Sequence, residues 1–83
     1  MKWYVYFLKS ERKKWYYVGS TNKLQERVKE HNQGKVLSTR PNRPLKLVHQ
    51  IEFTSEKEAR LYERKVKDMR KEKESIIRNI ENK

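Results

Sequence analysis

The spacing of hydrophobic and polar positions changes along the chain, and the changes predict the order of its elements. Residues 3–8 (WYVYFL) are aromatic and β-branched on both faces, which predicts a central strand. Residues 9–14 are polar and predict a turn, and residues 15–18 (WYYV) predict the returning strand, which Gly19 would end. Two such runs around a short polar break indicate a β-hairpin.

A helical period follows this hairpin. Asn22 and Gln25 resemble a capping box, so we expect a helix over about residues 23–32. Gly34 fits the left-handed position that closes a helix, and a loop with two prolines continues to residue 44. The apolar residues that would point from this helix into the core are Leu24 and Val28.

Residues 45–53 alternate between apolar and polar, which predicts a strand with one buried face. The apolar residues of that face are Leu45, Leu47, Ile51 and Phe53. His49 falls on the same side, where we expect a neutral, hydrogen-bonded histidine in the core or at the end of the sheet.

The last third of the chain has a helical period again. Residues 55–58 (SEKE) form a capping box, and a short break near residues 70–72 separates two predicted helices. The apolar stripe of the first helix is Ala59, Tyr62, Val66 and Met69, and that of the second is Ile76, Ile77 and Ile80. The order β-β-α-β-α-α predicts a small α+β domain with a three-stranded sheet flanked by helices.

The length of 83 residues predicts one domain, with a core over about residues 3–70 and a C-terminal helix or tail over 71–83. The chain has no cysteine, which excludes a disulfide framework and a thiolate zinc site. No apolar run approaches the roughly 20 residues of a membrane helix, and strand-like sequence starts too early for a signal peptide. We therefore expect a cytoplasmic monomer with no membrane partner.

The charge balance indicates a polyanionic partner. The chain has 22 Lys and Arg against 11 Asp and Glu, a formal charge of +11, and residues 33–50 contain no acidic residue. Such an excess favours nucleic acid, although a purely solubilising surface is the alternative. Hydroxyls and cations of the loop in this region could bind a nucleic-acid backbone, or form an ordinary polar loop. These candidates are Lys35, Ser38, Thr39, Arg40 and Arg43.

Arg27 and His31 share one face of the first predicted helix, because they are four residues apart. The guanidinium is a planar fork that binds phosphate oxygens in pairs. The imidazole could donate a proton to a leaving group or hold the phosphate. The alternative is a solvated face on which Arg27 pairs with Glu26 or Glu30.

Glu63 borders the apolar stripe of the second helix, so its carboxylate could reach into a cleft and hold Mg²⁺, with water filling the other positions. Alternatively it pairs with Lys67 one turn later, which is worth only about 0.2–0.5 kcal/mol.

The predicted hairpin is rich in tyrosine: Tyr4, Tyr6, Tyr16 and Tyr17. Tyrosines in a small core are usually packing residues with one hydroxyl partner. A phenol with a pKa of about 10 is a poor base at neutral pH. A metal ion and a guanidinium could lower that pKa; otherwise the phenol could only orient a metal-bound water. Both mechanisms require Glu63, Arg27 and the tyrosines to lie in one cleft.

Taken together, these motifs resemble the GIY-YIG nuclease domain over about residues 3–70, and look most like its small stand-alone bacterial members. Tyr4-Val5-Tyr6 stands where that family has Gly-Ile-Tyr, and Tyr17-Val18-Gly19 where it has Tyr-Ile-Gly. Arg27 and His31, and later Glu63, follow in the family's order. Tyr4 departs from the first glycine, which would alter the entrance to the site.

The resemblance implies a small antiparallel sheet flanked by helices and divalent-metal-dependent cleavage of phosphodiesters. Glu63 would ligate one Mg²⁺ or Mn²⁺ ion. Tyr6 and Tyr17 would face the scissile phosphate, one of them as base or as the group that positions water. Arg27 would neutralise developing charge, with His31 assisting.

The sequence therefore predicts an endonuclease with little sequence specificity. DNA is favoured over RNA as its substrate, and DNA repair is the expected biological role. A basic nucleic-acid-binding module without turnover is the main alternative. A third interpretation is a protein-interaction domain that docks through its aromatic hairpin, and it predicts no appreciable affinity for nucleic acid at physiological salt.

Overall fold

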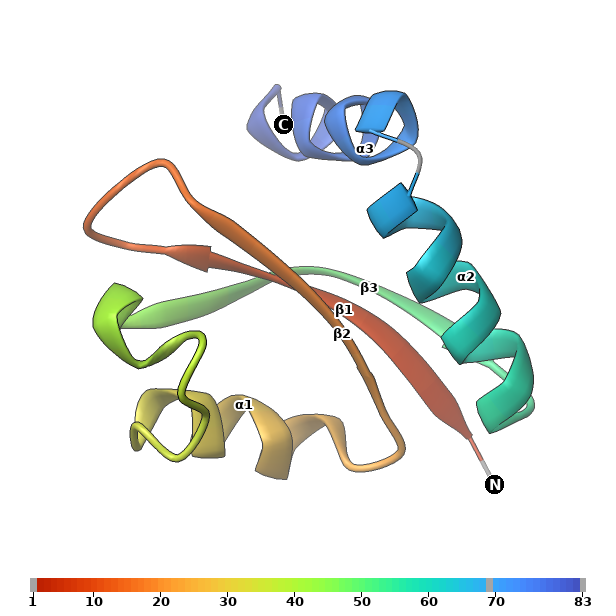
Figure 1. Cartoon of the computed structure of the whole chain (residues 1–83), viewed down its shortest axis with the longest axis horizontal. Helices are drawn as coiled ribbons and strands as arrows, with labels where there is room; N and C mark the ends of the chain where they lie inside the picture. The colour runs from red at the N-terminus through yellow and green to blue at the C-terminus, as the bar shows by residue number, and fades with distance from the viewer. Residues whose placement is uncertain (1, 69, 83) are drawn as a thin grey trace.

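The structure is a computed structural model that describes residues 2–68 and 70–82 (Figure 1). Its elements are β1 (Trp3–Ser10), β2 (Tyr16–Thr21), α1 (Leu24–Asn32), the 3-10 turn η1 (Arg40–Asn42), β3 (Leu45–Phe53), α2 (Glu56–Asp68) and α3 (Arg70–Glu81). The predicted order β-β-α-β-α-α and the α+β class with a three-stranded antiparallel sheet are confirmed.

β1 is the central strand of the sheet, as predicted, because the strand order is β2-β1-β3 and both pairings are antiparallel. The prediction that Gly19 ends the second strand is wrong. The β1 ladder continues past the Tyr6–Gly19 pair to Val5–Ser20 and Tyr4–Thr21. Strand pairing satisfies backbone groups that would otherwise lose their hydrogen bonds on burial.

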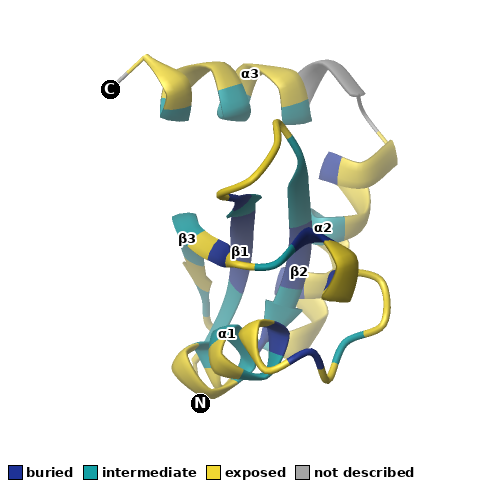
Figure 2. Cartoon of the chain, turned by 90° about the vertical axis from the view of Figure 1, so that its left-hand side faces the viewer, coloured by how far each residue is buried: buried dark blue, intermediate teal, exposed yellow. Residues whose placement is uncertain are grey.

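The two faces of the sheet carry two separate clusters, because successive side chains of a strand point to opposite sides. α1 covers one face and α2 the other (Figure 1). The α2-side cluster is built on Val5, Phe7, Val18, Ala59 and Val66, and the α1-side cluster on Tyr6, Leu8 and Leu45. Figure 2 shows that the buried residues concentrate in β1 and β2 between these helices. This explains why residues 3–8 of β1 are apolar or aromatic on both faces.

A bulge in β3 overturns the prediction of a single buried face. Leu8 pairs with Leu47 but Phe7 pairs with His49, so Val48 is an extra residue in the register. One inserted residue switches the following side chains to the other face. Leu47 therefore packs in the α1-side cluster, whereas the end of the strand packs in the α2-side cluster. The His49 ring is half-buried and lies 5.4 Å from that of Phe7.

The N-cap of α1 is Lys23 and not the predicted Asn22. The helix begins after Lys23, which makes no side-chain cap, and the backbone N–H of Lys23 instead donates to the Thr21 hydroxyl at 3.0 Å. The end of the helix agrees with the prediction. Gly34 has a φ of 80°, and the N–H groups of residues 34 and 35 donate to the carbonyls of residues 31 and 30. This is a Schellman closure, which favours glycine because a Cβ is strained at that φ.

The capping residue predicted for α2 is present, since the Glu58 backbone N–H donates to the Ser55 hydroxyl at 3.2 Å. Ala59 and Val66 are fully buried, and Ile76 of α3 packs against the same cluster. Met69, the last predicted member of this stripe, lies outside the described residues. Two separate helices are present as predicted, but α3 already begins at Arg70, so residues 70–72 are helical and the prediction of a break over them is wrong.

None of the helices within residues 2–68 and 70–82 has the length and apolar character that a membrane span requires.

Candidate active site

Tyr6 lies at the centre of the α1-side cluster with only 1% of its surface exposed. Its ring centroid lies 6.3 Å from that of Tyr17 and 5.8 Å from that of His31. Gly19, the partner of Tyr6 across the ladder, makes this placement possible. A Cβ at Gly19 would lie 2.6 Å from the Tyr6 hydroxyl oxygen and 2.7 Å from Cζ. The glycine is needed for this close approach, and not for a positive φ.

A chain of hydrogen bonds runs from Tyr6 into the loop after α1. The Tyr6 hydroxyl lies 2.9 Å from His31 Nε2, and His31 Nδ1 lies 2.8 Å from the Thr39 hydroxyl oxygen. Thr39 in turn donates to the Val36 carbonyl at 3.3 Å. Because the threonine proton is used there, Thr39 accepts from Nδ1–H, and the Nε2 lone pair accepts the phenol proton. This assigns one tautomer to His31.

The protonation states of Tyr6 and His31 agree with a hydrogen bond in which the phenol donates and the imidazole accepts. Burial, with help from the positive charge of Arg27, lowers the pKa of His31 to about 4, so the imidazole is neutral at pH 7. Burial, with a smaller effect of Tyr17, raises the pKa of Tyr6 to about 12, so the phenol keeps its proton. His31 is fully buried and both of its ring nitrogens are bonded. A buried imidazole with both nitrogens bonded has no free group for a phosphate, the direct contact that the sequence had suggested, and it contacts the rings of Tyr6 and Tyr17 instead.

Arg27 extends from α1 towards the same phenol. A hydrogen bond from its guanidinium opposes the rise in the pKa of Tyr6 that burial causes. It also forms an ion pair with Glu30 at 3.4 Å, the pairing that the helix spacing had left open. The Arg27 side chain is 39% exposed, so it remains accessible to a ligand.

Glu63 reaches the site from α2, around the edge strand β2. Its carboxylate accepts a hydrogen bond from the Ser20 hydroxyl at 2.5 Å and one from Lys67 at 2.6 Å. The Lys67 ammonium also lies 5.6 Å from the centroid of the Tyr17 ring. The negative charge of Glu63 is close enough to raise the pKa of Tyr6, after burial and Tyr17. The groups singled out from the sequence thus converge on one edge of the sheet.

The donors available to a metal ion are few. Among the described residues, no group of three or more His, Cys, Asp or Glu side chains could hold one. Glu63 is a single carboxylate, 19% exposed, whose outer oxygen already binds the cationic head of Lys67. Mg²⁺ keeps most of its waters and commonly binds through one or two carboxylates plus substrate phosphates. A single carboxylate from Glu63, together with a substrate phosphate, therefore matches the usual ligands of Mg²⁺.

Comparison with known proteins identifies the family. The model of the GIY-YIG catalytic domain matches residues 2–75. The chain belongs to the GIY-YIG family. GIY-YIG domains form a family of nucleases that act on nucleic acid and generally use divalent metal ions.

The relatives found for this GIY-YIG chain are UPF0213 proteins. It is 44% identical over 63 residues to one from Bacillus velezensis, a match over 74% of this chain and 64% of that protein, just under two thirds of its length. It is 37% identical to YazA of Bacillus subtilis, over 95% of this chain and 81% of the relative. A solution NMR structure of the UPF0213 protein BH0048 from Bacillus halodurans superposes with a TM-score of 0.58 at 35% identity, covering 93% and 83% of the two chains.

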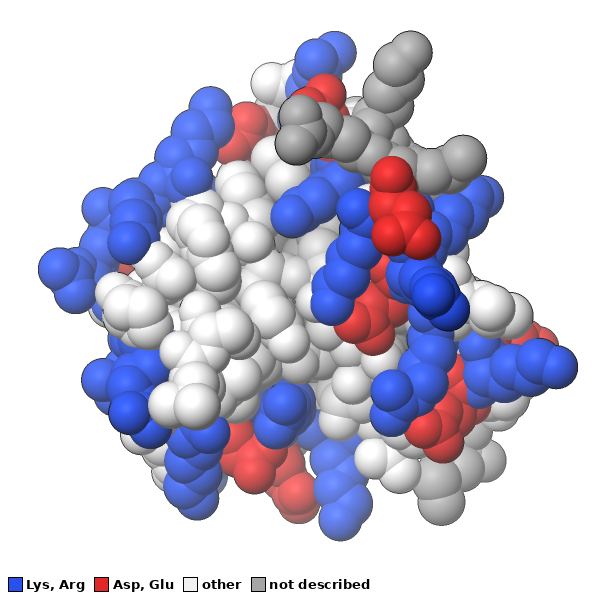
Figure 3. Space-filling model, in the orientation of Figure 1, with Lys and Arg blue, Asp and Glu red and all other residues white. Residues whose placement is uncertain are grey.

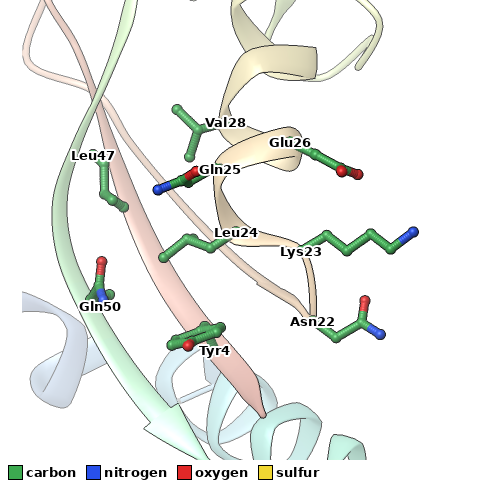
Figure 4. A pocket seen from close by; sticks show the side chains of 9 residues that line it. All are labelled: Tyr4, Asn22, Lys23, Leu24, Gln25, Glu26, Val28, Leu47 and Gln50. Carbon is green, nitrogen blue, oxygen red and sulfur yellow. The ribbon is translucent and has the colours of Figure 1, made fainter. Parts of the chain in front are cut away.

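Two other tyrosines of the hairpin of this GIY-YIG domain, Tyr4 and Tyr16, have different surroundings from Tyr6. Tyr4, at the position of the first family glycine, lines an open hollow of about 680 Å³ between α1 and β3, together with Leu24 and Gln50 (Figure 4). Tyr4 and Tyr6 are two residues apart on β1, so alternation along the strand places both on the α1 side of the sheet. Tyr16 donates its hydroxyl to Glu81 of α3 at 2.7 Å, so it joins the hairpin to the last helix.

The loop residues predicted to bind nucleic acid divide into two groups. Lys35, Ser38 and Arg40 are exposed and Arg43 is half-buried, so their side chains are accessible. Thr39 differs from the prediction, because it is fully buried and its hydroxyl faces His31 instead of solvent. The roles of Thr39 and Ser20 were missed, since no local period relates either residue to its partner.

We expect Gly19→Ala to displace the Tyr6 ring. The added methyl group would overlap the phenol in a filled site, which typically costs about 1–3 kcal/mol in the free energy of unfolding. Urea denaturation measures the loss, and NMR of the His31 ring reports whether the Tyr6 bond survives. A variant of unchanged stability with an unchanged His31 spectrum would show that the close approach is not required.

We expect stability to decrease as the pH falls from about 6.5 to about 4. In that window His31 binds a proton in the unfolded chain but not in the native protein, so acid favours unfolding, by up to about 3 kcal/mol from this group. NMR titration of the ring should give a midpoint near 4. His31→Asn should remove this part of the pH dependence; an equal slope in both proteins would contradict it.

Proposed function

We propose that this protein is a divalent-metal-dependent endonuclease that hydrolyses phosphodiester bonds of DNA in preference to RNA, with little sequence specificity. The observation that supports this most is the convergence of Tyr6, Arg27 and Glu63 beside the edge strand β2. We further propose that it acts as a cytoplasmic monomer, for which DNA repair is a fitting role.

The bond between Tyr6 and His31 supplies a route for the proton of the attacking water. Water bonded to the Tyr6 oxygen would give its proton to that oxygen as the phenol proton passes to His31 Nε2. The water oxygen would then form the new bond to phosphorus, and the departing sugar oxygen would leave and take a proton from solvent. Tyr6 thus acts without a stable phenolate, which its pKa of about 12 disfavours.

Substrate binding would make His31 a better base. The positive charge of Arg27 is one of the causes that keep the pKa of His31 low. A phosphate bound to Arg27 would offset that charge and raise the pKa of His31 towards its ordinary value. Proton transfer is then favoured only when a phosphodiester is in place. Tyr17 would line the same side of the phosphate.

Glu63 would hold the divalent ion, Mg²⁺ or Mn²⁺, which when bound would stabilise negative charge on the phosphate. Ser20 orients the carboxylate through its hydroxyl, so the ligand is held before a substrate arrives. The ammonium of Lys67 would leave its present position on Glu63 and remain near the phosphate as a second cation.

One observation favours the alternative, a nucleic-acid-binding module without turnover. Both oxygens of Glu63 are already bonded, one to Ser20 and one to Lys67. If Lys67 competes successfully with the metal ion, the protein would bind nucleic acid and not cut it. Turnover therefore has to be measured directly.

We expect Glu63→Gln to lose metal-dependent cleavage of nicked, branched and single-stranded DNA while it still binds them. Removing the charge removes the metal ligand, and a loss of about 100-fold or more in kcat is expected for an essential electrostatic group. Glu56→Gln is the matched control, because Glu56 also pairs with a cation one turn later at 2.6 Å on the same helix. Wild-type protein that leaves every substrate intact with Mg²⁺ or Mn²⁺ would favour the binding module.

We expect Thr39→Val to lower kcat about tenfold with little change in KM, because the loss of the acceptor at Nδ1–H frees His31 to adopt the other tautomer. Thr39→Ser keeps the hydroxyl and should restore the rate. Imidazole ¹⁵N shifts report the tautomer in each variant. A Val variant with the wild-type tautomer and rate would contradict the relay.

A further inference from the structure

A second basic feature lies at the hairpin end of the molecule, apart from the tyrosine site. It is a hollow of about 650 Å³, and three arginines contribute to its walls. Arg12 comes from the turn between β1 and β2, and Arg40 and Arg43 come from η1 and its end. The remaining lining residues are Asn32, Pro41 and Pro44. The fold thus brings together cations that lie about thirty residues apart in the chain.

Two of these arginines are held in place by the loop itself. The Nε–H of Arg40 donates to the Gly34 carbonyl at 2.7 Å, and the Nε–H of Arg43 donates to the Arg40 carbonyl at 2.9 Å. Asn32 ties the loop to β3 through two bonds to the Leu45 backbone, of 2.7 and 2.9 Å. The terminal nitrogens of the Arg40 and Arg43 guanidinium groups have no acceptor among the described residues. Their N–H donors therefore remain available to bind an oxyanion.

The positive charge of the hollow is not compensated. None of its lining residues is acidic, and within the described part of the chain none of the three arginines forms an ion pair. By contrast, Arg27 and Arg60 are paired with carboxylates at 3.4 and 2.6 Å. Figure 3 shows basic side chains along the left-hand edge, over the β1–β2 turn and η1. Such a cluster attracts anions more strongly than paired arginines do.

From this geometry we infer that the hollow formed by Arg12, Arg40 and Arg43 is a phosphate-binding subsite for the nucleic-acid backbone, distinct from the position of the scissile phosphate. Guanidinium forks bind phosphate oxygens in pairs, and backbone contacts of this kind set the register of the strand. The inference rests on the proposed function only in taking nucleic acid as the ligand.

The subsite is connected to the tyrosine site by a short path of one peptide bond and two hydrogen bonds. Arg40 follows Thr39, whose hydroxyl bonds to His31, which bonds to Tyr6. Asn32, on the wall of the hollow, follows His31 directly. A phosphate held here would fix the strand relative to Tyr6, so the subsite would determine which phosphodiester enters the proposed cleavage position. The bound phosphate can be an internal one or the terminal 5′-phosphate of a strand.

The decisive variant is Arg12→Gln, because the Arg12 side chain forms no bond with any other described side chain and its loss should leave the fold intact. Binding of labelled duplex DNA is measured by fluorescence anisotropy over a range of salt, without added metal, in a Glu63→Gln background. We expect Kd to rise about tenfold and the slope of log K against log salt to fall by about 0.9.

Arg60→Gln is the matched control, since it removes the same charge from an exposed side chain that lies 5.7 Å from the Trp3 ring, at the other end of β1. It should change Kd much less than Arg12→Gln. Arg40→Gln and Arg43→Gln should weaken binding as Arg12→Gln does. Thermal unfolding of each variant separates loss of the subsite from loss of the loop. Duplexes with and without a 5′-phosphate distinguish a terminal phosphate from an internal one.

Arg12, Arg40 and Arg43 variants that bind as the Arg60 variant does would overturn the subsite. A different result would contradict the proposed nuclease function alone: wild-type protein that binds DNA with the expected dependence on Arg12 but never cuts it. In that case the subsite stands and the protein is a binding module. Cleavage that persists with no dependence of binding on Arg12 leaves the nuclease in place and removes the subsite.

Discussion

The hydrogen bond between Tyr6 and His31 is the interaction on which the rest of the site depends. It requires a strand residue on the α1 side of the sheet, a neighbouring strand without a Cβ at Gly19, and a helix that presents its last turn to the phenol. Burial keeps the imidazole neutral and the phenol protonated, so the pair is stable as neutral partners. A proton can then move through the pair when an anion changes the local charge.

The edge strand β2 explains how residues from opposite layers reach one place. Alternation along β1 sends Tyr6 to α1 and its neighbours Val5 and Phe7 to α2. Glu63 belongs to the α2 layer, yet it approaches Tyr6 because β2 is an edge strand and only β2 lies between Tyr6 and that edge of the sheet. Ser20 at that edge provides the contact between the two layers. A central strand in that place would have separated the carboxylate from the phenol.

The basic charge of the chain is spatially organised. Arg27, in the tyrosine site, is partly neutralised by Glu30, whereas the arginines beside η1 have no acidic partner in the part of the chain that is described. The first arrangement suits a group that must exchange a partner during chemistry. Arginines without an acidic partner suit steady binding of a nucleic-acid backbone. Binding and chemistry would thus use separate cations, connected through the loop that carries Thr39.

The sequence by itself determined the strands, the helices, their order and the family motifs, because these follow from local periods of two and 3.6 residues and from short motifs. It also indicated Arg27, His31 and Glu63 by spacing. Only the tertiary structure decided the bulge at Val48, the burial of Thr39 against His31 and the meeting of Arg12 with Arg43. These depend on strand register and on the path of a loop, which join residues that no local period relates.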